Sequence, residues 1–189
     1  MKSIDIKSVI IGVLGTILVF VSIGATDKNL GDITVTSIYV VDEDGKPAVG
    51  IGTNENGGML IIYSADDQPV VGLMAHYGGG MLGVSRPDGE AVAIVSYEEG
   101  LGGNLSIYSA DGETAAILQS SKSGGVLDIK NKHGKQTSYL GTAEGGGFLQ
   151  TFNIHEKMTG YFGTNIDNDG VAMLFERYGD AGWGVRGKQ

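Results

Sequence analysis

The chain has 189 residues, enough for a domain with its own core, and 41% of them are hydrophobic, which excludes an intrinsically disordered chain. It contains no cysteine, so disulfides, cysteine-ligated zinc or iron–sulfur centres and thiol catalysis are excluded. The formal net charge of −9 argues against nucleic acid as a partner, because an acidic surface repels phosphate.

The first element in the chain is an uncharged apolar segment between Lys7 and Asp27. As a helix it is about as long as the hydrocarbon layer is thick, roughly 30 Å. Lysines precede the segment, so the positive-inside rule places the N-terminus in the cytoplasm and the remainder outside. We therefore predict an anchor in a bacterial inner membrane. A cleaved signal peptide is the alternative, because Ser22 and Gly24 are small enough for a cleavage site.

The expected organisation has four parts. They are a cytoplasmic N-terminus at 1–8, a transmembrane helix or signal peptide at 9–26, a linker or first strand at 27–37, and a periplasmic, extracytoplasmic β-repeat domain at 38–189.

A repeat of about 22 residues fills the chain from Ile38 onward. Each unit has a short apolar run, a polar turn, a second apolar run and a glycine-rich turn, which accounts for many of the 33 glycines. The polar turn is Asp44-Gly45, Asp88-Gly89 or Asp111-Gly112 in three units and His133-Gly134 in another. Asp-Gly between apolar runs is a strong hairpin signal, because glycine accepts the positive φ of the turn.

One large apolar residue recurs in the second run of every unit, and we expect these residues to stack as a core column. The column is Ile51, Leu73, Val95, Leu118, Leu140 and Phe162. Two positions earlier, on the same strand face, a second column shrinks toward the C-terminus. It reads Val49, Val71, Ala93, Ala116, Ser138 and Gly160.

Two mainly-β architectures fit this repeat, a meander of tandem hairpins and a two-sheet β-solenoid. The polar-turn column helps to choose between them; it reads Asp44, Asp66, Asp88, Asp111, His133 and His155. In a solenoid these turns stack about 4.8 Å apart, whereas in a meander they lie about 9.6 Å apart. Repulsion between the stacked carboxylates therefore favours the meander.

Some runs are apolar on both strand faces, as in Met59 to Tyr63. A single sheet does not leave two apolar faces in water, so it either curls over itself or meets a partner. This pattern predicts self-association or contact with another membrane or envelope protein.

The units follow the pattern GG-x-L-x-x-Y-x-x-D-G-x-x-x-x-x-L. From residue 38 to about residue 175 the chain resembles glycine-rich β-repeat proteins of bacterial envelopes that carry an N-terminal membrane anchor. That resemblance implies export and a β-repeat structure but no activity. MORN repeats are a looser likeness, and their aromatic–glycine pairs are mostly missing here.

Residues with metal-binding or sugar-binding chemistry are few. Asn165, Asp167, Asp169 and Glu176, with Gly170, approximate a calcium loop, although strands are expected to flank them and the repeat favours a plain turn there. His133 and His155 share a register without an obvious third ligand. The aromatics Tyr63, Tyr108, Tyr139, Tyr161 and Trp183 suit either strand packing or a sugar-stacking face.

The sequence presents no catalytic constellation, so we expect no enzyme and no cofactor. The expected function is a non-enzymatic, membrane-anchored structural and interaction subunit that docks on or stabilises a larger membrane or envelope assembly. The alternative is a module that binds envelope polysaccharide, with calcium as a possible aid.

Overall fold

The computed structural model describes residues 10–19 and 34–187. The chain divides into two units, Met1–Val35 and Thr36–Gln189. In the first unit residues 10–19 form a helix, which lies inside the predicted span 9–26; the rest of that span lies outside the described residues. Within the described ranges, no helix combines the length and the apolarity needed to cross a membrane.

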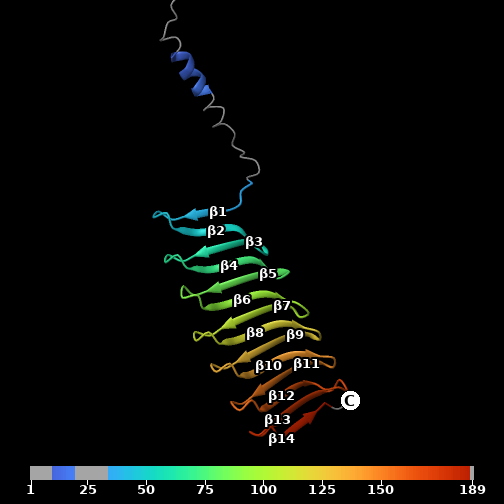
Figure 1. The fold of residues 1–189 in the computed structure, drawn as a ribbon. Helices are drawn as coiled ribbons and strands as arrows, with labels where there is room; N and C mark the ends of the chain where they lie inside the picture. Colours follow the sequence, from blue (N-terminus) through green and yellow to red (C-terminus); the bar gives the residue numbers. More distant parts are fainter. Residues whose placement is uncertain (1–9, 20–33, 188–189) are drawn as a thin grey trace, which may run out of the picture. The chain divides into compact units, whose positions relative to one another are not determined.

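The second unit is one antiparallel sheet of fourteen strands, each paired only with its neighbours in the chain (Figure 1). The predicted meander of tandem hairpins is confirmed, and the two-sheet solenoid is wrong. The strands are β1 (Ile38–Val41), β2 (Pro47–Asn54), β3 (Gly57–Tyr63), β4 (Pro69–His76), β5 (Gly79–Ser85), β6 (Ala91–Glu98), β7 (Gly102–Tyr108), β8 (Thr114–Ser121), β9 (Gly124–Lys130), β10 (Gln136–Ala143), β11 (Gly146–Phe152), β12 (Met158–Thr164), β13 (Gly170–Phe175) and β14 (Ala181–Arg186).

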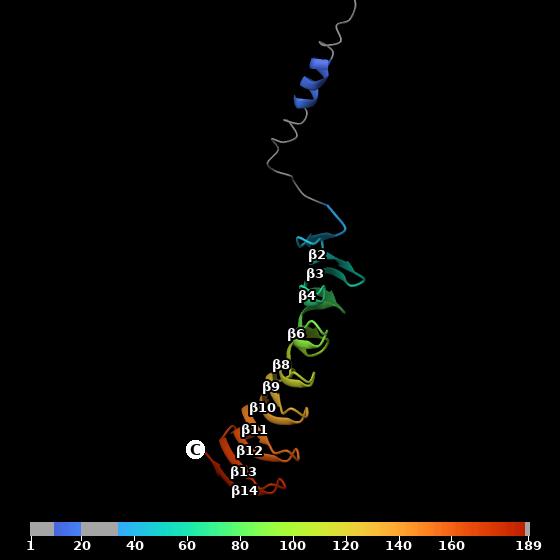
Figure 2. The ribbon, with the colours of Figure 1, turned by 90° about the vertical axis from the view of Figure 1, so that its left-hand side faces the viewer.

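The sheet is a single layer. Figure 2, turned by 90°, shows the strands of this unit following one another in one layer, with no second sheet of the unit on either face. The strand direction turns gradually from β1 to β14 in Figure 1, as expected from the right-handed twist of strands. A single layer has no closed interior, so the two faces of the sheet decide what this unit can do.

The turns after odd-numbered strands lie at the left in Figure 1, and we call them left-edge turns. They share one hydrogen-bond pattern: the first residue's N–H donates to the carbonyl of the fifth residue, and its carbonyl accepts from the N–H of the fourth. In the turn after β7, Ser109 N donates to Glu113 O (2.8 Å) and Gly112 N donates to Ser109 O (3.1 Å). The fourth residue has positive φ, +79° at Gly112. A β-bulge in the strand pairing lies next to the turn. This is the turn chemistry that the Asp-Gly pairs predicted.

A polar side chain closes several left-edge turns from their first position. Asp42 Oδ1 accepts bonds from the backbone N–H groups of Asp44 and Lys46, both at 2.9 Å. Asn131 and Asn153 do the same in their turns. The amide groups of the turn are thus satisfied locally, so the turn residues need no partner from elsewhere in the sheet.

The turns after even-numbered strands are right-edge turns, and most of them end in the glycine pair of the repeat. The first glycine of a pair is required by the fold. At Gly124 φ is +135°, and a Cβ there would lie 2.3 Å from Thr142 Oγ1. The Thr142 hydroxyl donates to Ser123 O (2.9 Å), so it joins this turn to a strand one hairpin further along.

Glu156 occupies the positive-φ position of the turn after β11, where five other left-edge turns have glycine at +71° to +95°. Its φ is +61°, and its carboxylate pairs with Lys135 at 3.4 Å. We expect Glu156→Gly to be more stable than Glu156→Gln by about 0.5 to 1 kcal/mol, because only glycine adopts this backbone without a Cβ clash. Urea unfolding measures the difference. The glutamine variant removes the ion pair but keeps the strained backbone. If Glu156→Gly is less stable than Glu156→Gln, the expectation is wrong.

Candidate interaction face

One residue from each of the fourteen strands forms a continuous cross-strand row, which we call the ladder. Residues directly opposite one another in antiparallel strands lie on the same sheet face, so all fourteen share that face. The ladder reads Ile38, Ile51, Leu60, Leu73, Leu82, Val95, Leu105, Leu118, Leu127, Leu140, Leu149, Phe162, Ala172 and Val185.

A second row runs beside the ladder on the same face, two residues along each strand. It is apolar from β1 to β9, turns small or polar over β10 to β12, and ends in Leu174 and Trp183. Its members are Val40, Val49, Ile62, Val71, Val84, Ala93, Ile107, Ala116, Ile129, Ser138, Thr151, Gly160, Leu174 and Trp183. No charged residue occurs in either row. We call the surface formed by the two rows the ladder face.

The predicted core column maps onto the ladder, one residue per hairpin. Its members are exposed rather than enclosed: Ile51 45%, Leu73 53%, Val95 45%, Leu118 52%, Leu140 52% and Phe162 69%. Their nearest cross-strand neighbours are the aliphatic residues of the odd-numbered strands, so the column is a surface ridge in this chain. Within the described part of the chain, the sheet leaves its most regular apolar feature in contact with solvent.

The opposite face, which we call the packed face, is more covered. Among the described residues the buried positions are Gly50, Ser106, Val126 and Gly141, and the pairing register places all four on this face. Val126 is 5% exposed and is the only buried apolar side chain in the described ranges. Because no second sheet covers this face, the burial of these residues must come from side chains of the sheet itself.

Large side chains on the packed face lie over glycines of their own strand or of a neighbouring strand. A Cβ built at Gly141 would meet the Tyr139 ring at 2.6 Å and the Phe148 ring at 3.4 Å, and one at Gly163 would meet Phe148 at 2.5 Å. The rings of Tyr139, Phe148 and Tyr161 stack in sequence, with centroids 5.7 and 6.0 Å apart. The packed face thus covers itself, because the missing side chain of each glycine leaves room for a ring to pack against the backbone.

Beside the two rows, on the same sheet face, lie further glycines, and nothing in this chain fills the space above four of them. They are the second residues of the glycine pairs. A Cβ at Gly58, Gly80, Gly103 or Gly125 would meet no atom within 4 Å, and φ is ordinary at all four. Apolar hollows of about 410, 380 and 320 Å³ recur beside these pairs. Neither backbone strain nor internal packing requires these glycines.

A further hollow of about 310 Å³ lies near the C-terminal end of the ladder face. Its floor is Gly160 with Thr151, and its walls include Phe162, Leu174 and Trp183. The hollow exists because the second row shrinks to small residues here while the ladder bears its largest side chain. It is an open apolar depression rather than an enclosed site.

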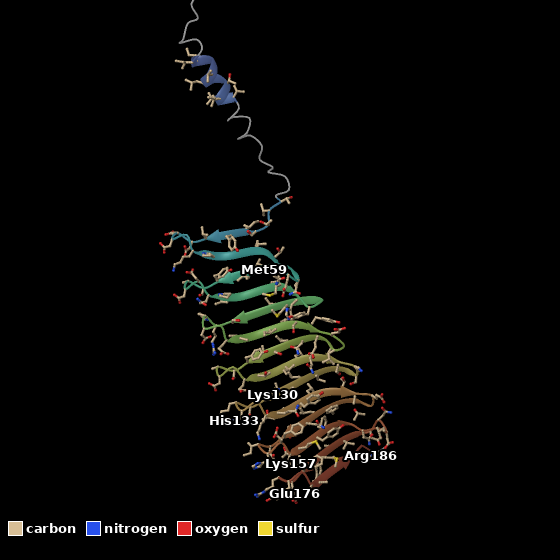
Figure 3. All side chains as sticks on the ribbon, in the orientation of Figure 1. Met59, Lys130, His133, Lys157, Glu176 and Arg186 are labelled. Atoms are coloured by element: carbon tan, nitrogen blue, oxygen red, sulfur yellow. The ribbon has the colours of Figure 1, made fainter. Side chains whose placement is uncertain are left out.

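The calcium candidates are not brought together. Asp167 and Asp169 lie in the turn between β12 and β13, whereas Glu176 lies in the turn at the other end of β13, about 20 Å along the strand. Figure 3 shows Glu176 and Arg186 toward opposite edges of the sheet. Asn165 Oδ1 accepts bonds from the N–H groups of Asp167 and Asp169, at 3.0 and 2.9 Å.

A guanidinium already stands between the two carboxylates. Arg186 Nη2 lies 2.5 Å from Asp167 Oδ2, and Arg186 Nε lies 2.6 Å from Asp169 Oδ2. The hydrogen bonds to Asp169 and then Asp167 raise the pKa of Arg186 above its ordinary value. In the described ranges no group of three or more His, Asp or Glu side chains is placed to hold a metal ion.

The two histidines are exposed and lie in successive left-edge turns, with the β10–β11 hairpin between them; Figure 3 shows His133 at that edge. Of the acidic turn residues, Asp88 has a pKa lowered from its ordinary value, first by the backbone N–H of Glu90 and also by Arg86. Asp88 therefore acts as a turn-closing acceptor, with its Oδ1 at 3.0 Å from that N–H.

Arg186→Gln is expected to lower the melting temperature in low salt, because it leaves two carboxylates close together at the edge strand. The loss should shrink at about 1 M salt, where exposed charges are screened within about 3 Å. Thermal melts at two salt concentrations measure it. Arg177→Gln is the matched control, since the Arg177 guanidinium lies 5.7 Å above the Tyr178 ring. A loss that is independent of salt would contradict the ion-pair interpretation.

No protein-family model matches the chain, and a search of curated proteins finds no match either. The ladder face therefore has to be interpreted from its own chemistry. The predicted core column did not include the residues of the odd-numbered strands that extend it into the ladder. The signal was present: Ile51 and Leu60 stand at equal distances from the turn that joins their strands, so a tight turn makes them partners.

Proposed function

We propose that this chain is a non-enzymatic structural and interaction subunit of a bacterial envelope assembly, and that the ladder face is its working surface. The observation that supports the proposal is an uncharged double row of residues, largely aliphatic, that crosses all fourteen strands and whose members are exposed or partly exposed. Monomeric soluble proteins seldom expose apolar patches beyond a few hundred Å², and larger ones commonly mark interfaces.

The location is part of the same proposal. The uncharged segment between Lys7 and Asp27 anchors the chain in the inner membrane, the N-terminus stays in the cytoplasm, and the repeat domain lies in the periplasm. The described helix 10–19 lies within this segment. Anchoring holds a sheet with an exposed apolar face close to its membrane partners and keeps its concentration in free solution low.

The proposal is tested on the full chain in its membrane. Carbonate washing should leave the chain in the membrane, and added protease should degrade the repeat domain only after the outer membrane is opened. Cross-linking before solubilisation should then capture the repeat domain with protein. A chain released by carbonate would refute the anchor. A ladder face that captures no protein of any kind would refute docking.

Polysaccharide binding, the alternative function, has less support from the arrangement of the aromatic rings. Tyr139 and Tyr161 lie on the packed face, with their rings stacked on Phe148, whereas Trp183 lies on the ladder face. Aromatic rings that stack with one another on one face do not form a platform together with a ring on the other.

A further inference from the structure

We propose that the ladder face is covered by the ladder face of a further copy of this same chain, so that two single-layer sheets form one sandwich. The proposal rests on the proposed function and names the partner. It starts from the absence of a second layer over the described sheet. Domains are normally built from two packed layers, and a lone sheet with one apolar face is an incomplete core.

The area of the ladder face suits a dimer. Fourteen strands spaced about 4.8 Å apart make the face about 60 Å long, and the two rows together are about 12 Å wide. Covering this strip on two copies removes about 1,400 Å² from solvent in total, within the range of stable protein–protein interfaces, about 1,200–2,000 Å². The interface would have the apolar composition of a sandwich core.

The chemistry of the face favours a copy over an unrelated protein. Neither row offers a charge, and the second row supplies hydroxyl groups only at Ser138 and Thr151, so there is little for a dissimilar partner to recognise. A copy presents the same two rows over the same length. A two-fold interface needs a surface that is complementary to itself, and uncharged aliphatic rows are so by composition.

The unexplained glycines fit the same arrangement. Gly80 and Gly125 are exposed, have ordinary φ and have open space above them. Their strands would accept a side chain, and leaving it out allows a second sheet to approach at the right-edge side of the face.

Charge gives the proposal a distinct signature. The net charge of −9 is carried outside the two rows, so two copies bring like-charged rims together. Added salt screens this repulsion and strengthens association between copies. A basic partner would show the opposite dependence, with capture weakening as salt rises.

The absence of cysteine allows a direct test in the membrane with the full chain. Single cysteines are placed at neighbouring positions on opposite faces, Leu118→Cys on the ladder face and Gln119→Cys on the packed face. Leu73→Cys and Met74→Cys form a second matched pair. A flexible bismaleimide then reports which face lies near another copy, and mass spectrometry identifies what each cysteine is joined to.

We expect the ladder-face cysteines to give chain-to-chain products at least tenfold more than their packed-face neighbours, and more at high salt. Gly80→Gln with Gly125→Gln should reduce this yield severalfold without changing the circular dichroism spectrum. Lys122→Gln, the same new side chain in a turn, should not reduce it. With one cysteine in each chain, the two-armed linker joins at most two copies, so a chain-to-chain dimer is the product that identifies a copy as the occupant.

The negative outcomes separate the two proposals. Equal yields on both faces, or adducts of the ladder-face cysteines with a different protein, overturn the inference but leave docking intact. Ladder-face cysteines that react fully with a maleimide dye and join no protein overturn both. Loss of the circular dichroism signal in the glutamine variants would move the decision to the four single-cysteine chains, which keep every glycine.

Discussion

Val126→Asp is expected to lower the free energy of unfolding by about 3 kcal/mol or more, the largest effect of any single substitution considered. Val126 is 5% exposed on the packed face, opposite Gln119. A carboxylate there would lose most of its water, and a hydrogen bond from the Gln119 amide opposite would offset only part of that cost. It would also stand two residues from Asp128 on the same strand face, so repulsion adds to the desolvation cost.

The matched control for that change is Val92→Asp on β6, where the side chain is 39% exposed. The same chemical change should cost less than about 1 kcal/mol there, because the new carboxylate keeps its water. Urea unfolding followed by circular dichroism, at one fixed protein concentration, measures both. Equal losses at the two positions would mean that the packed face is not the structural core of the sheet.

Gly124→Ala is expected to cost about 2 kcal/mol or more. With φ at +135° the residue lies in a region that is strained for any side chain, and the added Cβ would overlap the Thr142 hydroxyl and lie 3.2 Å from Thr142 Cβ. Relief requires the Thr142 side chain to move, which breaks its hydrogen bond to Ser123 O. Strain and a lost bond thus act together.

Gly125→Ala supplies the control for Gly124→Ala one residue away. Its Cβ would meet nothing within 4 Å and its φ is ordinary, so the change should be neutral within about 0.5 kcal/mol. The two variants are compared by thermal and urea unfolding. A comparable loss from both would show that the glycine pair acts as a unit, against the division of roles described for it.

The repeat made much of the fold predictable. Leu118 and Leu140 are one unit apart, and a constant spacing with one hairpin per unit returns each to the same strand face. Asp111 and Gly112 marked a turn that the structure has at that place, because an isolated hairpin turn depends on local backbone preferences. Local rules of this kind act within a few residues and are legible without coordinates.

The candidate site was only partly legible. Asp167 and Asp169 suggested a cation loop, but Arg186, 17 to 19 residues away, supplies the positive charge through strand pairing. The tyrosines Tyr139 and Tyr161 suggested a sugar platform, yet both lie on the packed face among neighbouring rings. The sequence could not separate these alternatives from a plain turn and from strand packing, because strand alternation gives the face of a residue relative to its neighbours but not what covers that face.

By itself the sequence determined the hairpin unit, its period, the turn positions and the alignment of Ile51 through Phe162, because all of these follow from local turn chemistry and two-residue alternation. Only the tertiary structure decided that one sheet holds all fourteen strands and that the ladder stays exposed while the packed face covers itself. The reason is that burial depends on which side chains lie over which glycines across neighbouring strands, and those contacts exist only once the strands are paired.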